Sequence, residues 1–208
     1  MSIVYIYVLD TLADWELGYV TSELNSGRFV KKGAKQVTIK FVGCSKKPIT
    51  TMGGLTIVPD CLVEDINLDE ASTLLLPGAD TWNDPMHATI LERAKKLLNV
   101  GATVCAICGA TIALANAGIL DNRPHTSNGP GFLEMFAPGY RGQSFYVDGL
   151  AVADQNLITA GPAGALLWTK QIIKRMEVFG EDALEAWYEF FNTGEAQYFF
   201  KLMQAVGK

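Results

Sequence analysis

The side chains that could perform covalent chemistry are few in this sequence, because it contains only two histidines and four cysteines. Cys108 follows an apolar run, and the small residues Ala106 and Ala110 lie two positions before and after it. That spacing is typical of a nucleophile elbow, a sharp turn from a strand into a helix that exposes the nucleophile. Gly109 comes next, so its backbone N–H should lie at the start of the helix, where it favours a thiolate and can stabilise an oxyanion. We therefore predict Cys108 as the candidate nucleophile.

Cys105 and Cys108 also form a C-x-x-C pattern, which raises a redox dithiol and a zinc site as alternatives. In a thioredoxin-like dithiol the first cysteine is exposed at the end of a strand, whereas Cys105 lies inside the apolar run 103–107. A structural zinc site needs four ligands, and the sequence offers no second C-x-x-C and no neighbouring pair of histidines. The pattern favours Cys105 as a small buried residue. We expect no metal site and no cofactor.

Apolar runs and amphipathic segments alternate along the chain, and this alternation predicts the elements that position Cys108. The two glycines Gly53 and Gly54 separate two short strand-like runs and predict a hairpin over 49–58. The other expected strands cover 3–9, 36–43, 72–76 and 102–107, with short strands near 125–127, 145–147 and 157–159. The expected helices cover 13–24, 85–98, 108–117, 161–178, 181–192 and 194–206.

This order of elements implies right-handed crossovers and an α/β fold. We expect a three-layer flavodoxin-like sandwich, with a mostly parallel central sheet and helices on both faces. Sites in such sheets form at the carboxyl ends of the strands. We expect a single domain over 1–208, of which 181–208 is a C-terminal helical extension. Its aromatic residues recur at helical spacing, and they either pack onto the domain or form a lid or dimer interface.

Composition restricts the partners and the compartment. The chain of 208 residues is 49% hydrophobic and has a formal net charge of -5, so we expect a globular protein that binds no nucleic acid and no membrane. Residues 100–120 carry no charge, but their glycines, threonines and asparagine favour a strand followed by a helix over a membrane span. The cysteines suggest no disulfide framework and the first residues no secretory signal, which predicts a cytoplasmic location.

Motifs that follow the expected strands identify a resemblance to a known family. The chain carries Ala13-Asp-Trp-Glu16, Leu76-Pro-Gly-Ala79 and Ala106-Ile-Cys-Gly109 in that order, and the similarity extends to Thr126-Ser-Asn128, Val147-Asp-Gly149 and 156–161. With these motifs it resembles the ThiJ/PfpI family. That family lies within the class I glutamine-amidotransferase-like superfamily, which includes a parkinsonism-linked deglycase/chaperone protein.

The resemblance implies roles for four residues. Cys108 would be the reactive thiol, Glu16 would hydrogen-bond its sulfur, and the backbone N–H groups of Gly109 and Ala79 would form the oxyanion site. Two anions in contact raise each other's pKa, so a carboxyl beside a sulfur is useful only when it is protonated. We therefore expect a neutral Glu16 that donates to a Cys108 thiolate. The alternatives are a solvated carboxylate at Glu16 and a structural cysteine at Cys108.

The sequence departs from the family where its relatives keep histidines. Protease-like members have a histidine directly after the nucleophile, where this chain has Gly109, and many others keep one at the position of Asn128. Asparagine can orient a substrate or water but cannot accept a proton. His125 would face away from Asn128 in a strand, and we expect it at the surface or in a turn.

The expected substrate pocket contains Asn128, Gly78, Trp82 and His87. Gly78 belongs to the turn after strand 72–76, and Trp82 and His87 follow it closely in the chain. Trp82 would wall the pocket or serve as a core residue. His87 would lie at the rim or have a purely structural role.

These observations favour a cysteine-dependent enzyme in which Cys108 attacks a small carbonyl or amide-like electrophile, as in a glyoxalase, deglycase or hydrolase. Protease activity is disfavoured because no histidine is placed to activate the thiol. One alternative is a redox-responsive stress protein or holdase whose Cys108 is oxidised without turnover. Another is a glutamine amidotransferase-like protein. We expect a small-molecule substrate and a homodimer.

Overall fold

The central sheet is mostly parallel, as expected. The computed structural model describes residues 2–69 and 72–207. Its main sheet has seven strands in the order β5-β2-β1-β6-β7-β9-β8. Neighbouring strands run parallel except for β8 and β9, which are antiparallel. The strands are β1 (Ser2–Tyr7), β2 (Val37–Gly43), β5 (Cys61–Leu62), β6 (Thr73–Leu76), β7 (Thr103–Ile107), β8 (Ala151–Asp154) and β9 (Leu157–Ala160).

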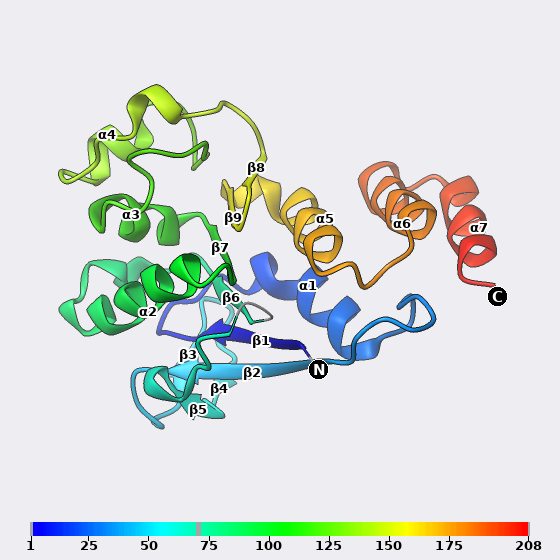
Figure 1. Cartoon of the computed structure of the whole chain (residues 1–208), viewed down its shortest axis with the longest axis horizontal. Coiled ribbons are helices and arrows are strands. Elements are labelled where there is room, and N and C mark those ends of the chain that lie inside the picture. Colours follow the sequence, from blue (N-terminus) through cyan, green and yellow to red (C-terminus); the bar gives the residue numbers. More distant parts are fainter. Residues whose placement is uncertain (1, 70–71, 208) are drawn as a thin grey trace.

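Helices cover both faces of this sheet and complete the expected three-layer flavodoxin-like sandwich. One face carries α1 (Asp14–Ser26) and α5 (Ala165–Met176) (Figure 1). The other carries α2 (Ala88–Asn99) and α3 (Gly109–Asn116) (Figure 1). The expected helix over 85–98 begins with a 3-10 turn, Pro85–His87, before α2 starts.

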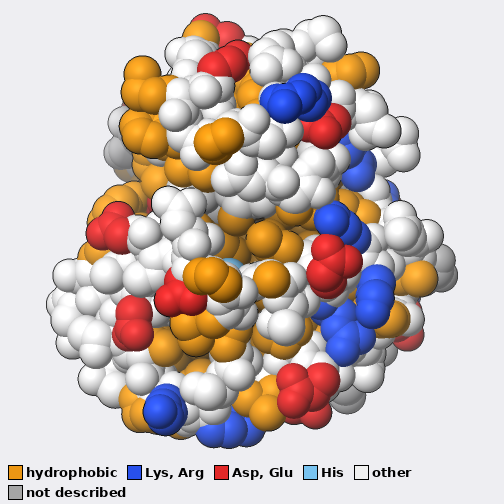
Figure 2. Space-filling view, turned by 90° about the vertical axis from the view of Figure 1, so that its left-hand side faces the viewer, with side chains coloured by type: hydrophobic (Ala, Val, Ile, Leu, Met, Phe, Trp, Pro, Cys, Tyr) orange, Lys and Arg blue, Asp and Glu red, His pale blue; other side chains and the backbone are white. Residues whose placement is uncertain are grey.

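The remaining helices lie outside these layers. The short helix α4 (Phe132–Phe136) lies above α3, and the closing helices α6 (Glu181–Thr193) and α7 (Ala196–Ala205) lie beyond α5 at the edge of the molecule (Figure 1). Figure 2 views the face of α2, α3 and α4 and shows hydrophobic side chains on the upper part of it, where α4 lies. Met135 and Phe136 of α4 are exposed there.

Burial of the inner strands explains why their sequences are apolar throughout. Every residue of β6, β7 and β9 is buried, as are Val4–Tyr7 of β1. Parallel strands covered by helices on both faces are expected to show such unbroken apolar runs. The uncharged segment 100–120 divides into β7 and α3, as predicted. Within the described part of the chain, no helix has both the length and the apolar character needed to cross a bilayer.

The structure differs from the sequence prediction at the β8 edge of the sheet. We expected strands near 125–127 and 145–147, but this region has only an isolated bridge between His125 and Tyr146. Pro124 has no backbone N–H to donate to a ladder. The neighbour of β9 is instead β8, whose sequence Ala-Val-Ala-Asp has little strand character. The short elements β5 and α4 were not predicted either.

The predicted hairpin is present and braces the loop that follows β1. Its strands β3 (Ile49–Thr50) and β4 (Thr56–Ile57) pair antiparallel. The N–H of Thr50 donates to Oδ1 of Asp10 over 2.8 Å, and the N–H of Gly53 donates to Oδ2 of Asp14 over 2.6 Å. The hairpin therefore holds both ends of the segment that leads from β1 into α1.

The closing helices dock through a buried tryptophan. Trp187 of α6 is fully buried, and its indole N–H donates to Oε1 of Glu23 on α1 over 3.0 Å. Glu23 is itself buried and forms an ion pair with Arg28. One side of the aromatic stripe thus packs onto the sandwich, whereas Phe199 and Phe200 of α7 stay exposed.

We expect Trp187→Ala to destabilise the protein by ~3–5 kcal/mol, because it leaves a cavity and removes the hydrogen bond to Glu23. Chemical denaturation followed by circular dichroism measures the change. Met135→Ala is the control, since Met135 is 74% exposed, and it should alter the free energy of unfolding by less than ~0.5 kcal/mol. Equal effects of the two substitutions would contradict docking through Trp187.

Candidate functional site

Cys108 occupies a strained turn between β7 and α3. Its backbone has φ 56° and ψ −126°, a conformation that residues other than glycine rarely adopt. Its N–H donates to the carbonyl of Ala160 over 2.9 Å. Its carbonyl accepts hydrogen bonds from both the N–H and the hydroxyl of Thr111, at 3.0 and 2.6 Å. Strain of this kind persists only where the surroundings enforce it, and it is common at functional sites.

The Cys108 sulfur is half-buried and lies among hydrogen-bond donors. Nδ2 of the exposed Asn128 lies 3.6 Å from Sγ, within hydrogen-bonding range for sulfur. The backbone N–H of Gly109 also favours a negative charge on this sulfur. The structure therefore brings Asn128 to the sulfur although no regular strand carries it, and both donors would stabilise a thiolate.

Glu16 lies under the sulfur with its carboxyl fully buried. Oε2 accepts the N–H of Gly78 over 2.6 Å, whereas Oε1 has no hydrogen-bond partner among the described residues. The backbone of Gly78 packs against both Glu16 and Cys108. A Cβ added to Gly78 would lie 2.8 Å from Oε1 of Glu16 and 2.8 Å from the Cβ of Cys108. Only glycine fits at this position. A solvated carboxylate, the alternative for Glu16, is not what the structure shows.

The two acidic groups oppose each other's ionisation. Burial raises the pKa of Glu16 to about 7, against the lowering effect of the hydrogen bond from Gly78 and of the neighbouring Cys108 thiol. Burial and the negative charge of Glu16 raise the pKa of Cys108 to about 11, although Asn128 and Gly109 lower it. The pair therefore loses one proton near neutral pH and keeps the other until strongly alkaline pH. An acidic thiol, as expected from the sequence, requires that the retained proton resides on Glu16.

The backbone groups expected to bind an oxyanion lie next to each other. A Cβ on Gly109 would come within 2.8 Å of the carbonyl oxygen of Ala79 and 3.4 Å of its nitrogen. The N–H of Ala79 makes no hydrogen bond within residues 2–69 and 72–207. Two backbone donors thus lie close together at the carboxyl ends of β6 and β7, next to the Cys108 turn.

Trp82 packs against this turn, whereas His87 belongs to a different cavity. Trp82 is buried, its indole N–H donates to the carbonyl of Pro77 over 2.9 Å, and its Cδ1 would lie 3.4 Å from a Cβ on Gly109. His87 is also buried, and its Nδ1 lies 2.7 Å from the hydroxyl of Tyr7. It lines a cavity with Tyr7 and Cys44, so the structure places it behind Trp82 instead of at the rim beside Cys108.

His125 is a core residue, which corrects the expected surface or turn position. It is fully buried, its Nδ1 lies 2.8 Å from the carbonyl of Arg123, and its Nε2 lies 2.7 Å from the hydroxyl of Tyr140. Because a carbonyl only accepts, Nδ1 carries the proton and Nε2 accepts from Tyr140. Burial lowers the pKa of His125. The Tyr140 partner lies 15 positions away in the chain, beyond the reach of a local sequence pattern.

Sequence reasoning missed two residues that support the turn. The hydroxyls of Thr111 and Ser127 lie 2.6 Å apart and are buried, and Thr111 also holds the Cys108 carbonyl. Ser127 precedes Asn128 by one position, so this contact fixes the segment that carries the amide. The hydroxyl residues in these two segments were visible in the sequence, but only the fold shows that they meet.

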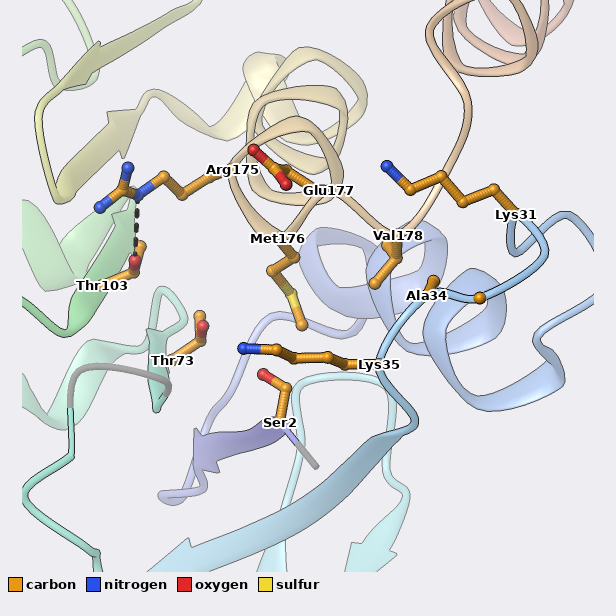
Figure 3. Close-up of a pocket in the computed structure, with 11 residues that line it drawn as sticks. Ser2, Lys31, Ala34, Lys35, Thr73, Thr103, Arg175, Met176, Glu177 and Val178 are labelled. Atoms are coloured by element: carbon orange, nitrogen blue, oxygen red, sulfur yellow. Dashed lines mark hydrogen bonds between the residues drawn. The ribbon is translucent and has the colours of Figure 1, made fainter.

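A second cavity, larger than the one that His87 lines, lies at the amino ends of the strands, opposite to Cys108. It has a volume of about 450 Å³ and is lined by Ser2, Thr73 and Thr103, which begin β1, β6 and β7. Figure 3 shows Lys35 reaching toward Ser2 and Thr73, and Arg175 hydrogen-bonded to Thr103. Among the described residues, no cysteine or histidine lines this cavity. The nucleophile predicted from the sequence therefore lies elsewhere, at the carboxyl ends.

Known proteins resemble this chain along most of its length. A sequence profile of the DJ-1/PfpI family matches residues 2–175. The uncharacterized protease YoaZ of Bacillus subtilis is 42% identical over 205 residues, 99% of this chain and 98% of that protein. A deglycase of Pyrococcus abyssi is 31% identical over 132 residues, 62% of this chain and 76% of that protein. The crystal structure of a ThiJ/PfpI family protein from Bacillus anthracis has a TM-score of 0.96 and 44% identity, covering 100% of this chain and 99% of that one.

We expect Gly78→Ala to destabilise the protein by ~1–3 kcal/mol, because the new methyl group collides with Glu16 and Cys108. Gly18→Ala is the matched control: an added Cβ meets nothing within 4 Å, and Gly18 lies inside α1. That change should stabilise the protein by about 1 kcal/mol, the usual gain from alanine in a helix. Urea denaturation of both variants measures the two effects, and a neutral Gly78→Ala would show that the packing is looser than the structure indicates.

Proposed function

This chain belongs to the DJ-1/PfpI family, and we propose that it is an enzyme in which Cys108 adds to the carbonyl carbon of a small carbonyl compound. One observation carries the proposal: the buried carboxyl of Glu16 and the amide of Asn128 surround the Cys108 sulfur, while both histidines make their hydrogen bonds elsewhere. The family and the names of its relatives, deglycase and protease, support a cysteine-dependent activity.

The proposed step uses the one proton that Glu16 and Cys108 share. With this proton on Glu16, the Cys108 thiolate forms an S–C bond with the carbonyl carbon, and the π pair of the C=O bond moves to oxygen. The N–H groups of Gly109 and Ala79 stabilise that oxyanion. Glu16 then gives its proton to the oxygen, and the product is a hemithioacetal. Glu16 is left as a carboxylate beside the former carbonyl carbon, where it can act as a base.

Carbonyl addition suits this site better than amide hydrolysis. An amide must release an amine, and the usual thiol hydrolases protonate it with a histidine that has also activated the thiol. Here Nδ1 of His87 lies against Tyr7, and both nitrogens of His125 are occupied by Tyr140 and Arg123. Addition to an aldehyde has no leaving group, so a single carboxyl is sufficient.

We expect Cys108→Ser to abolish turnover of glyoxal and methylglyoxal, because a serine hydroxyl is far less acidic than a thiol and a carboxylate is too weak a base to deprotonate it. Glu16→Gln should lower kcat by ~10²–10⁴-fold, the usual contribution of a general acid or base. Consumption of the aldehyde measures both effects, and Cys61→Ser is the control that should retain activity. If Cys108→Ser turned over every tested aldehyde like the wild type, the proposal would fail.

The pH dependence of iodoacetamide labelling at Cys108 tests where the shared proton resides. If Glu16 holds it, the Cys108 thiolate carries the charge, and labelling has its midpoint below ~8.5, the value of a free cysteine. A midpoint near 11 would place the charge on Glu16 instead. Glu16→Gln separates the two cases: it should leave a neutral midpoint nearly unchanged, but it should lower an alkaline one because it removes a neighbouring charge.

A redox-responsive protein without turnover is the second candidate, favoured by the half-buried, uncrosslinked thiol of Cys108. Intact-mass analysis after mild peroxide distinguishes the two functions. Gain of two or three oxygens at Cys108 alone, with no aldehyde turnover, would support this candidate over the enzyme. Release of ammonia from glutamine would point to amidotransferase chemistry instead.

The proposal includes a cytoplasmic homodimer with a small-molecule substrate. Free thiols at all four cysteines suit a reducing compartment. Phe199 and Phe200 are 40% and 69% exposed on α7, and covering them in a dimer would remove apolar surface from water. Sedimentation analysis measures the oligomeric state.

A further inference from the structure

A second thiol lies in a cavity of its own at the carboxyl ends of β1 and β2. The cavity has a volume of about 240 Å³, and Cys44, Tyr7 and His87 line it. Cys44 is half-buried, whereas Tyr7 and His87 are 0% and 2% exposed. Trp82 packs against the rings of Tyr7 and His87 and also against Gly109, so it separates this cavity from the Cys108 site.

The three side chains form a continuous hydrogen-bonded relay. The hydroxyl of Tyr7 lies 2.6 Å from Sγ of Cys44 and 2.7 Å from Nδ1 of His87. Imidazole nitrogen is a far better acceptor than sulfur, so the hydroxyl donates to Nδ1. The S–H of Cys44 then has two acceptors within reach, the Tyr7 hydroxyl at 2.6 Å and the carbonyl oxygen of Met86 at 3.2 Å. A proton can therefore leave the sulfur while the proton of Tyr7 moves to His87.

His87 leaves one polar atom unused inside the protein. With Nδ1 accepting from Tyr7, the neutral ring carries its proton on Nε2, and this atom is buried without a hydrogen-bond partner in the described part of the chain. Leaving a buried donor unpaired costs ~1–3 kcal/mol. A carbonyl oxygen that reaches Nε2 would accept this proton and remove the cost.

We propose that this cavity is a second reactive site, in which Cys44 adds reversibly to a small aldehyde and Tyr7 and His87 carry the proton. The thiol proton passes to Tyr7, and the proton of Tyr7 passes to Nδ1 of His87, leaving a thiolate and an imidazolium. The S–C bond forms as the π pair of the C=O bond moves to oxygen. The imidazolium returns one proton to that oxygen, so the product is a hemithioacetal and no co-reactant or leaving group is required.

The surroundings limit the ligand to a small, uncharged molecule. Asp10, Lys47 and Asp84 also line the cavity, so it presents charges of both signs. Asp10 accepts the N–H of Thr50 and Asp84 accepts that of Met86, so both carboxylates are already engaged. The volume admits an aldehyde of a few heavy atoms but not a peptide. The proposal does not depend on the function of Cys108, because no atom of Cys108 takes part.

The test uses the full chain carrying Cys108→Ala, glycolaldehyde as the aldehyde, and iodoacetamide labelling at pH 7 read by peptide mass spectrometry. Glycolaldehyde should protect Cys44 from alkylation at a concentration at least ~10-fold lower than it protects N-acetylcysteine, because the relay and His87 favour the adduct. Labelling of Cys61 should not change. Protection of Cys44 no better than that of N-acetylcysteine would overturn the proposal.

Variants separate the relay from ordinary exposure of a thiol. Tyr7→Phe keeps the ring but breaks the relay, and it should reduce protection of Cys44 to that of N-acetylcysteine. Tyr146→Phe is the matched control, because the Tyr146 hydroxyl has no partner among the described residues, and it should have no effect. If Tyr7→Phe does not fold, His87→Gln makes the same test, since glutamine accepts no proton. If glycolaldehyde still protected Cys44 fully from alkylation in folded Tyr7→Phe or His87→Gln protein, the proposal would be contradicted.

Discussion

One electrostatic constraint governs the Cys108 site: a buried carboxyl and a half-buried thiol lie together, and no cation is paired with either within the described part of the chain. Two negative charges on neighbouring groups are too costly in a low-dielectric environment. Glu16 and Cys108 together therefore carry one negative charge over a wide pH range. Compensation comes from neutral dipoles, namely the N–H groups of Gly78 and Gly109 and the amide of Asn128. The carboxyl ends of β6 and β7 must therefore present their backbone to the site, and bulky side chains there would prevent it.

The inner layers of the fold were predictable because the physics is local. Strands buried on both faces must be apolar throughout, and the runs that became β1, β6 and β7 show this directly. The β8 edge of the main sheet was not predictable from the sequence. The residues of β8 are small and weakly strand-forming, and their pairing with β9 depends on where the sheet has an open edge. Near His125, an apparent strand is reduced to one bridge because the neighbouring position in the sheet is already taken.

The candidate site was predictable only where its residues belong to contiguous motifs. The turns around Cys108 and Gly78 could be recognised from short-range spacing, and family resemblance joined Glu16 to them. The proximity of Cys44, Tyr7 and His87 could not be recognised, because their contacts span 37 and 80 positions in the chain. The hydrogen bond between His125 and Tyr140 likewise joins two separate segments, 15 positions apart. Local spacing carries no information about such contacts.

The hairpin of β3 and β4 has a mechanical consequence for Glu16. Through Asp10 and Asp14 it clamps the short segment that leads from β1 into α1, and Glu16 lies in the first turn of that helix. The carboxyl therefore has little freedom to swing away, and the entropy of positioning it is lost during folding instead of during each encounter with a ligand. Substitutions that break these two hydrogen bonds would loosen the position of Glu16 without contacting it. A surface hairpin can thus influence the protonation of the Cys108 thiol indirectly, through the position of Glu16.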